Sequence, residues 1–282
     1  MTTLRHRLAA TLSGAALAAG ALVAVTGPGA SGSAAPAAAV DVSPPGANDF
    51  DCKPDRRHPQ PVVLVNGTFE TMEKNWATMS PYLADKGYCV FAFNYGNRAT
   101  GPIGRSARQL RTFVNKVRSA TGRSRVDLVG HSQGGMMPRY YLKYLGGAKK
   151  VDDLVGIAPS SHGTRMAMNG DGGGASPCRA CEQQAAGSRF LKRLNRGGDT
   201  VRGPDYTVIS TRFDEVVTPW QSQFLDGPRA RVTNILLQDK CATDVIEHDQ
   251  APNDPVAQQI VLDALRVDGP AREGVRPDCT VV

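Results

Sequence analysis

Five residues near the middle of the chain have the types and spacing of a nucleophile held on a tight turn. Gly130-His131-Ser132-Gln133-Gly134 matches the pattern G-x-S-x-G. Glycines at the two outer positions lack the Cβ atoms that would clash where the chain turns sharply. Such a turn exposes the Ser132 hydroxyl and points the Gln133 N–H at any developing oxyanion. The pattern predicts nucleophilic attack by Ser132, with chance occurrence as the alternative.

A serine hydroxyl attacks a carbonyl group when a histidine accepts its proton, and a carboxylate orients that histidine. On such strand–turn–helix sites the acid and then the histidine follow the serine along the chain. His248 follows the last predicted strand and is the expected base. His58 precedes the first strand, and His131 adjoins Ser132, so neither is suitably placed. We expect His162, which follows Ser132 more closely, in a pocket wall or a structural hydrogen bond.

Two neighbouring carboxylates follow the penultimate predicted strand. Asp214 comes first and Glu215 second. Because an aspartate is the commoner orienting residue, we expect Asp214 to hold His248. Glu215 is expected to cap the turn or to pair with an arginine. Asp199 and Asp205 precede the same strand and are expected at its opposite end.

A second backbone donor normally comes from the loop after the first major strand. Here that loop reads Asn66-Gly67-Thr68-Phe69. Many enzymes with this motif carry His-Gly at this point, and Asn66 replaces the histidine. Gly67 lets the backbone turn, so the Thr68 N–H is the expected partner of the Gln133 N–H, and the Thr68 hydroxyl is a candidate third donor. The alternative is an ordinary strand-to-loop turn.

The elements that must position these residues alternate along the chain. Continuous apolar runs, typical of strands buried on both faces, occur at 61–65, 88–93, 125–129, 153–158, 206–210 and 232–237. Helix-like segments lie between them at 75–86, 106–121, 133–145 and 187–194. A last helix begins at Pro255, with Asp254 as its cap. This alternation predicts an α/β fold with about six strands in a mostly parallel sheet, flanked by helices on both faces.

The ends of the chain and one Gly-rich segment depart from this alternation. Residues 40–60 are rich in Pro, Gly and Asp and are expected to form an extended arm. Residues 61–282 then suit a single domain. Within it, 163–187 contains the run GDGGG and is expected to be a mobile insertion. It is a candidate lid, with a surface loop as the alternative.

The first 39 residues have the pattern of a secretory signal peptide. Arg5 and Arg7 precede an apolar run at 8–25, and small residues follow up to Ala39. A membrane anchor is the alternative, but the run is rich in Ala and Gly rather than Leu. We therefore expect cleavage near Ala39, secretion, and no integral membrane segment after cleavage.

The pattern of charges argues against a nucleic acid partner. The chain has 33 basic and 26 acidic residues, and removal of the leader leaves 31 basic residues, a net charge of +5. No block of Lys and Arg exceeds two or three residues, and a clustered basic face with aromatic residues is not evident. The composition favours a soluble, secreted surface with no nucleic acid partner, and leaves a general attraction to anionic surfaces open.

The six cysteines all lie after the predicted leader: Cys52, Cys89, Cys178, Cys181, Cys241 and Cys279. An even number in an exported chain predicts disulfides, whose connectivity the sequence alone leaves open. Cys178 and Cys181 also have the spacing of a redox pair or of half a zinc site. Since no second C-x-x-C is present, a small structural disulfide is favoured. No ligand cluster predicts a metal, and the predicted chemistry needs no cofactor.

These motifs resemble those of the secreted class 2 lipases and esterases of the α/β-hydrolase superfamily, especially from actinobacteria, over residues 61–265. The segment 130–141, GHSQGGMMPRYY, is particularly similar to this family. The segments VNGT at 65–68, TRFDEVVTP at 211–219 and VIEH at 245–248 are similar to lipases of the Candida antarctica lipase B type. Asn66, which replaces the more usual histidine, is a departure from the family pattern that affects the fine geometry of the oxyanion loop and not the expected reaction class.

The resemblance implies specific roles and pairings. It implies a Ser-Asp-His triad at Ser132, Asp214 and His248, with Thr68 and Gln133 as oxyanion donors. It also implies three disulfides, which are Cys52–Cys89, Cys178–Cys181 and Cys241–Cys279. The last of these would tie the C-terminal tail to the loop before His248.

Together these features predict a secreted carboxylic ester hydrolase, acting through an acyl-enzyme on triacylglycerols or shorter acyl esters. The alternatives are acyl transfer to another alcohol, polyester hydrolysis, and a binding module without catalysis. We expect a monomer whose partner is an ester or lipid, with a lipid–water interface as one setting. Candidates to line an acyl pocket, each individually more typical of a core, are Phe69, Trp76, Trp220, Phe224 and Ile246.

Overall fold

The computed structural model describes residues 41–166 and 178–281. The predicted leader at 1–39 and the centre of the predicted insertion, 167–177, lie outside the described residues. The strands are β1 (Val62–Val65), β2 (Val90–Ala92), β3 (Val126–His131), β4 (Val151–Ile157), β5 (Asp205–Ser210) and β6 (Val232–Leu236). The α-helices are α1 (Met72–Asn75), α2 (Met79–Asp85), α3 (Gly96–Ala99), α4 (Ile103–Thr121), α5 (Gln133–Tyr144), α6 (Arg179–Gln184), α7 (Arg189–Asn195), α8 (Leu237–Lys240) and α9 (Pro255–Ala264). Short 3-10 turns are η1 (Gly147–Lys149), η2 (Trp220–Gln223), η3 (Ala251–Asn253) and η4 (Cys279–Val281).

The six strands form one sheet in the order β2-β1-β3-β4-β5-β6. Every pairing between neighbours is parallel, so the predicted six-stranded, mostly parallel sheet is confirmed. Val65 at the end of β1 pairs with Gly130, and His131 at the end of β3 pairs with Ile157 of β4. The loops that leave these strands therefore start from the same edge of the sheet, which brings their side chains together.

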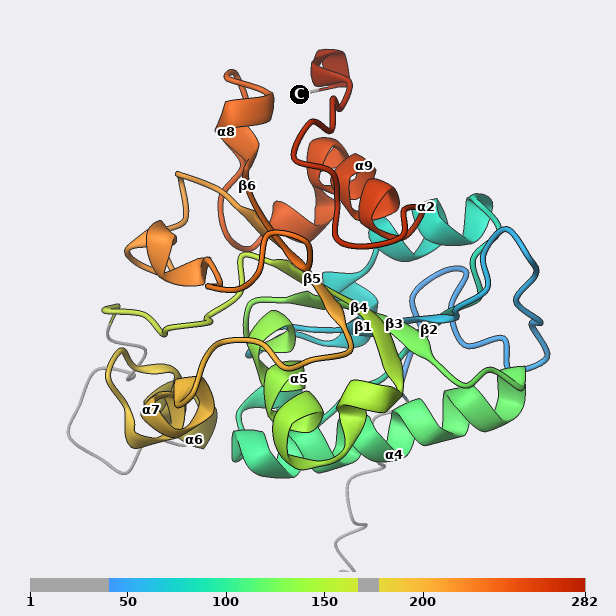
Figure 1. Cartoon of the computed structure of the whole chain (residues 1–282), viewed down its shortest axis with the longest axis horizontal. Helices are drawn as coiled ribbons and strands as arrows, with labels where there is room; N and C mark the ends of the chain where they lie inside the picture. Colours follow the sequence, from blue (N-terminus) through green and yellow to red (C-terminus); the bar gives the residue numbers. More distant parts are fainter. Residues whose placement is uncertain (1–40, 167–177, 282) are drawn as a thin grey trace, which may run out of the picture. The chain divides into compact units, whose positions relative to one another are not determined.

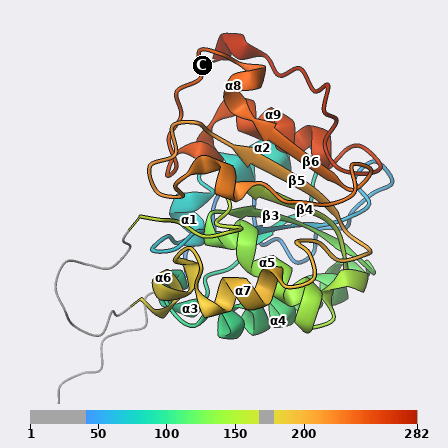
Figure 2. The ribbon, with the colours of Figure 1, turned by 60° about the vertical axis from the view of Figure 1, so that its left-hand side comes forward.

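Two apolar layers cover the sheet because successive strand residues point to opposite faces. In β1, Val63 and Val65 pack with α4 and α5, whereas Val62 and Leu64 pack with α2 and α9. Figures 1 and 2 show α4 and α5 on one side of the sheet and α2 and α9 on the other. This arrangement explains why the strands read as continuous apolar runs.

The boundaries of one predicted helix differ from those in the structure. The expected helix 75–86 is two helices, α1 and α2, broken after Asn75. Trp76, in the break, is fully buried in the core, while the Asn75 side chain bonds the loop after β1. Within the expected insertion at 163–187, residues 179–184 form α6.

Disulfides hold the chain's outer segments against the sheet. The predicted arm pairs with β2 through Ala47 and Val90, and the Cys52–Cys89 disulfide lies beside that contact. All three pairings implied by the family resemblance are present, the others being Cys178–Cys181 and Cys241–Cys279. None of the helices in the described part of the chain is long and apolar enough to cross a membrane.

Candidate active site

Ser132 occupies the turn between β3 and α5 with a backbone conformation that side chains rarely adopt, φ 54° and ψ −122°. A Cβ on Gly130 would lie 1.9 Å from the Gly134 carbonyl oxygen, and a Cβ on Gly134 would lie 1.9 Å from the Val65 carbonyl oxygen. The predicted need for glycine at both positions is therefore confirmed. The strained turn places Ser132 at the sheet edge and is the kind of local strain found at functional sites.

His248 and Asp214 approach the same edge from the loops after β6 and β5. His248 Nδ1 donates to Asp214 Oδ2 across 2.7 Å, and both side chains are buried. The other carboxylate oxygen, Oδ1, accepts the backbone N–H groups of Val216 and Val217 at 2.9 and 2.6 Å. Asp214 is thus fixed from both ends, and its neighbour Glu215 is exposed, with no side-chain hydrogen bond among the described residues.

Ser132 and His248 line one pocket of about 220 Å³. The loop after β1 contributes Thr68, Phe69 and Glu70 to this pocket. Its remaining lining residues are His131, Met166, Val216 and Asp249. The structure therefore brings together the predicted nucleophile, the predicted base and the predicted oxyanion loop, with the predicted acid behind the base.

Two backbone N–H groups beside Ser132 have no acceptor within the described part of the chain. Gln133 is the first residue of α5, so its N–H has no partner inside the helix. The Thr68 N–H likewise makes no hydrogen bond to a described residue, whereas the next N–H, of Phe69, donates to the Arg98 carbonyl oxygen. These are the two N–H groups that were predicted from the sequence as donors to an oxyanion.

The Thr68 hydroxyl accepts two side-chain amides. Gln133 Nε2 donates to Thr68 Oγ1 at 2.7 Å, and Gln184 Nε2 donates to the same atom at 2.9 Å. Gln184 is itself oriented by Ser160, whose hydroxyl donates to Gln184 Oε1 at 2.7 Å. Since a hydroxyl oxygen has two lone pairs, both are used, and the Thr68 hydroxyl hydrogen remains for a third partner.

A buried network connects the three loops of the site. Asn75 Oδ1 accepts the Gly67 N–H at 2.8 Å, and its Nδ2 lies 3.1 Å from His131 Nδ1. His131 Nε2 in turn lies 3.0 Å from the His248 carbonyl oxygen. Burial and then the neighbouring His248 lower the pKa of His131 well below its usual value, so the ring is neutral. With Nε2 protonated, each contact in this chain has one donor and one acceptor.

Gln184 and Gln223 contact predicted site residues, and Asn75 contacts their neighbours Gly67 and His131, yet none of the three was predicted from the sequence. Gln223 is fully buried in η2, and its Nε2 donates to Asp214 Oδ2 at 2.7 Å. The sequence contains no local signal for these contacts, because the partners lie in other segments. Only the position of η2 just after the predicted acid could have suggested Gln223.

His162 forms structural hydrogen bonds, as one of its two predicted roles required. Its ring contacts the Ser222 carbonyl oxygen at 3.0 Å and Asp199 at 3.1 Å, and the hydrogen bond to Asp199 raises the pKa of His162. The predicted place of Asp199 is wrong. Although it precedes β5, the loop carries it to buried Arg139 of α5 and to His162, which follows β4.

The candidate acyl-pocket residues separate into two groups. Phe69 lines the pocket and is 47% exposed. Trp76 is fully buried in the core, Ile246 packs against the α9 layer, and Trp220 forms an edge-to-face pair with Phe224 at 5.5 Å. Within residues 41–166 and 178–281, no three His, Cys, Asp or Glu side chains gather as a metal ion would require.

Comparison with known proteins agrees with this geometry. A family model described as "Lipase (class 2)" matches residues 59–261, most of the chain. The chain is 37% identical over 87 residues to triacylglycerol lipases of Pseudarthrobacter phenanthrenivorans and Burkholderia plantarii. Those matches cover 28% of this chain and 27% and 24% of the respective relatives. The chain therefore spans about a quarter of the length of the curated relatives it matches.

Solved structures show the same fold. Lipase B of Aspergillus fumigatus superposes with a TM-score of 0.69 at 25% identity, covering 82% of this chain and 57% of that one. The mature form of the Bacillus licheniformis lipase BlEst2 superposes with a TM-score of 0.61 at 15% identity, covering 76% and 94%. The sheet order, the helix layers and these neighbours identify the α/β-hydrolase fold. With the family match over most of its length, the chain belongs to the class 2 lipase family of the α/β-hydrolase superfamily.

Proposed function

We propose that the chain is a secreted serine carboxylic ester hydrolase that acts through an acyl-enzyme formed on Ser132. One observation carries the proposal. Ser132, on its strained turn, shares a pocket with His248, while His248 Nδ1 donates to the buried Asp214 carboxylate. A nucleophile, a base and an orienting acid in this order are what acyl transfer requires.

The hydrogen bond to Asp214 determines which histidine nitrogen does the chemistry. Because Nδ1 carries the proton donated to Asp214, Nε2 holds a lone pair. Nε2 removes the Ser132 proton as Oγ attacks the ester carbonyl carbon, and Asp214 stabilises the resulting imidazolium. His248 then passes that proton to the departing alcohol oxygen, which leaves the acyl group on Ser132 Oγ.

Three donors are available to the carbonyl oxygen as it becomes an oxyanion. Two are the Thr68 and Gln133 N–H groups, which have no other acceptor among the described residues. The third is the Thr68 hydroxyl, whose oxygen already accepts two amides and whose hydrogen is therefore available. Donors fixed in place before the reaction stabilise the developing charge, each by about 10²–10³ in kcat.

A water molecule completes the cycle by the same route. His248 Nε2 removes one of its protons, the oxygen attacks the acyl carbonyl carbon, and the same donors hold the second oxyanion. Ser132 Oγ takes the proton back and the carboxylic acid leaves. No step needs a metal ion or a cofactor.

Exposed apolar side chains around the pocket support lipid esters as the substrate class. Phe69, Met166, Phe213 and Val245 are 44–69% exposed, and each lies on a segment that carries a site residue or lines the pocket. Exposed apolar groups gathered at a site mark a surface for an apolar ligand. The relatives named triacylglycerol lipases point the same way. Three disulfides support secretion, because they persist in oxidising compartments.

The experiment is ester hydrolysis by the wild type and by Ser132→Ala, with Ser119→Ala on the exposed face of α4 as the matched control. p-Nitrophenyl esters of increasing chain length serve as substrates, followed by a triacylglycerol below and above its solubility limit. We expect Ser132→Ala to lose about 10⁶-fold in kcat and the control to lose nothing. A folded Ser132→Ala protein with near-normal turnover overturns the proposal. Acyl transfer, the alternative chemistry, is distinguished by product analysis with a competing alcohol.

A further inference from the structure

The fold gathers cations that are scattered in the sequence. Nine exposed Lys and Arg side chains from α4, α6, α7 and the residue after α7 form what we call the basic face: Arg105, Arg108, Arg111, Lys116, Arg179, Arg189, Lys192, Arg193 and Arg196. Figures 1 and 2 show these helices on the same side of the sheet, and α6 contacts both α4 and α7. The sequence contains no long block of basic residues, but the folded surface does have a clustered basic face.

The amphipathic pattern of α4 produces one half of this face. Its apolar side chains, Leu110 and Val114 among them, are buried against the sheet, and the helix contains no Asp or Glu. The charged residues on its exposed side are therefore all basic, among uncharged residues such as Gln109 and Ser119. Helix α7 contains no acidic residue either, and α6 contains only Glu182, which pairs with Arg179.

The basic face is continuous and mostly uncompensated. A groove of about 840 Å³ is lined by seven of the nine cations, and Arg105 and Arg108 also line the adjoining pocket that contains Arg111 and Lys116. Apart from Arg179, none of the nine forms an ion pair with a described residue. The two aromatic rings in the groove, Tyr140 and Phe190, stack on each other with their centroids 5.7 Å apart.

The basic face is dense in positive charge, because α4, α6 and α7 contain one acidic residue, Glu182, whereas residues 40–282 as a whole contain 31 basic and 26 acidic residues. Without the nine cations and Glu182, residues 40–282 contain 22 basic and 25 acidic residues. The basic face is thus more positive than the chain as a whole. Such an uneven distribution of charge orients a protein at an anionic surface instead of only attracting it.

The basic face adjoins the pocket. On one side of α6, Gln184 bonds Thr68 at the pocket, while Arg179 and Glu182 of the same helix line the basic groove. Helix α3 and its C-cap touch both regions, since Arg98 bonds the Phe69 backbone and the Thr100 carbonyl oxygen accepts the Ala180 N–H. Exposed Phe69 and the cations therefore lie on neighbouring surfaces.

We propose that the basic face docks the protein on anionic phospholipid bilayers, with the pocket and its exposed apolar residues at the edge of the contact. Phosphate groups complement the unpaired guanidinium groups, and Phe69 and Met166 supply apolar contacts that a bilayer accepts. A polyanion such as DNA or heparin matches the charge but not these apolar side chains. Docking on a bilayer is a property separate from ester hydrolysis, because binding to the vesicles is measured without turnover.

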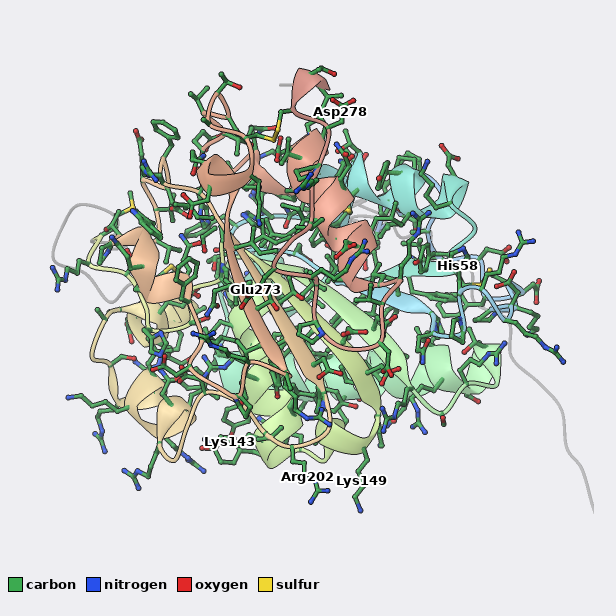
Figure 3. The ribbon with its side chains drawn as sticks, turned by 45° about the horizontal axis from the view of Figure 1, so that its top comes forward. His58, Lys143, Lys149, Arg202, Glu273 and Asp278 are labelled. Atoms are coloured by element: carbon green, nitrogen blue, oxygen red, sulfur yellow. A yellow bond between two sulfur atoms is a disulfide. The ribbon has the colours of Figure 1, made fainter. Side chains whose placement is uncertain are left out.

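The test is co-sedimentation of the protein with vesicles, using Ser132→Ala as the background so that lipid is not consumed. Vesicles of phosphatidylcholine alone are compared with vesicles of equal parts phosphatidylcholine and phosphatidylglycerol, at low and high salt. The docking variant replaces Arg105, Arg108, Arg189 and Lys192 with Gln. The matched control replaces four exposed cations from other segments, Lys149, Arg202, Arg229 and Arg276, and Figure 3 labels the first two.

We expect binding to anionic vesicles only, weakened by salt, with a partition coefficient about 100-fold lower for the docking variant and within about twofold for the control. In the wild-type background, both variants should hydrolyse a water-soluble p-nitrophenyl ester normally. Equal binding to both vesicle types, or equal losses in both variants, overturns the proposal. Tight binding of DNA or heparin without binding to anionic vesicles also overturns it and assigns the face to a soluble polyanion.

Discussion

His131 Nε2 lies 3.0 Å from the carbonyl oxygen of His248, so the residue before the proposed nucleophile supports the loop of the proposed base. Two histidines separated by 117 positions in sequence thereby have different functions. His248 is hydrogen-bonded to a carboxylate and faces the pocket, whereas His131 is buried, neutral and bonded to Asn75. Asn75 extends the support to the Gly67 N–H in the oxyanion loop.

Replacement of His131 with Phe is expected to lower kcat by about 10²-fold, because a displaced His248 no longer meets Ser132 in the reactive geometry. KM should change little, since His131 is almost entirely buried and offers substrate little contact. The measurement is kcat and KM on p-nitrophenyl butyrate. The control is His58→Phe, at a ring that stacks on Tyr88 and is labelled in Figure 3. Equal kcat values in both variants would contradict the supporting role.

The Thr68 hydroxyl can be separated from the Thr68 N–H by substitution. Thr68→Val keeps the backbone donor and the shape but removes the hydroxyl, so kcat should fall by about 10²-fold. Thr68→Ser keeps the hydroxyl and should retain most of the activity. Steady-state kinetics on a soluble ester check both values. If Thr68→Val matches the wild type, the hydroxyl is not a donor to the oxyanion.

Gln223 offers a test of how the acid is held. Gln223→Leu removes the amide that donates to Asp214 Oδ2 and leaves that oxygen with His248 alone. A tenfold or larger loss in kcat is expected, in line with about 1.5–3 kcal/mol for a hydrogen bond to a charged group. Gln221→Leu, an exposed neighbour in η2, is the matched control. A rise in KM with kcat unchanged would indicate a substrate contact instead of a positioning role.

The half-buried carboxyl group of Asp153 makes stability depend on pH. Burial, followed by the nearby Asp127 and Asp152, raises the pKa of Asp153 to about 10. The folded protein therefore keeps a proton that the unfolded chain loses near pH 4, and the free energy of unfolding falls as pH rises between about 4 and 10.

Asp153→Asn removes the contribution of this residue to the pH dependence. Its Tm should exceed that of the wild type by several degrees at pH 8, at about 2–4 °C per kcal/mol, and should match it at pH 4. Thermal unfolding followed by circular dichroism at both pH values measures the effect. The exposed Asp85→Asn on α2, which is not among the neighbours that raise the pKa of Asp153, should show no such pH-dependent difference. A lower Tm for Asp153→Asn at pH 8 would show that the charged form is the stable one.

The parts of the site that follow from local rules were predictable. Gly130 and Gly134 reveal the turn because any side chain there would collide with backbone oxygens 1.9 Å away. The parallel sheet then places Asp214 and His248 at one edge, because the ends of neighbouring parallel strands coincide. The order of a few His and Asp residues along the chain was sufficient to predict Asp214 as the acid and His248 as the base.

The supporting contacts were not predictable from local rules. Gln184 reaches Thr68 across 116 positions, and any of several glutamines could have done so. Asn75 looked like the start of a helix, whereas in the structure it ends α1 and the next residue, Trp76, is fully buried. Asp199 was misplaced because the loop before β5 carries it to Arg139, which a strand-based argument does not capture. The basic face likewise needs the packing of α4, α6 and α7.

The central claim is that Ser132 is the nucleophile and His248 its base. The most direct measurement is mass spectrometry of the intact and digested protein after treatment with diethyl p-nitrophenyl phosphate. We expect one diethylphosphoryl group per chain, on Ser132, formed much more slowly in His248→Ala and not at all in Ser132→Ala. Labelling of another residue, or undiminished labelling of Ser132→Ala, would contradict it.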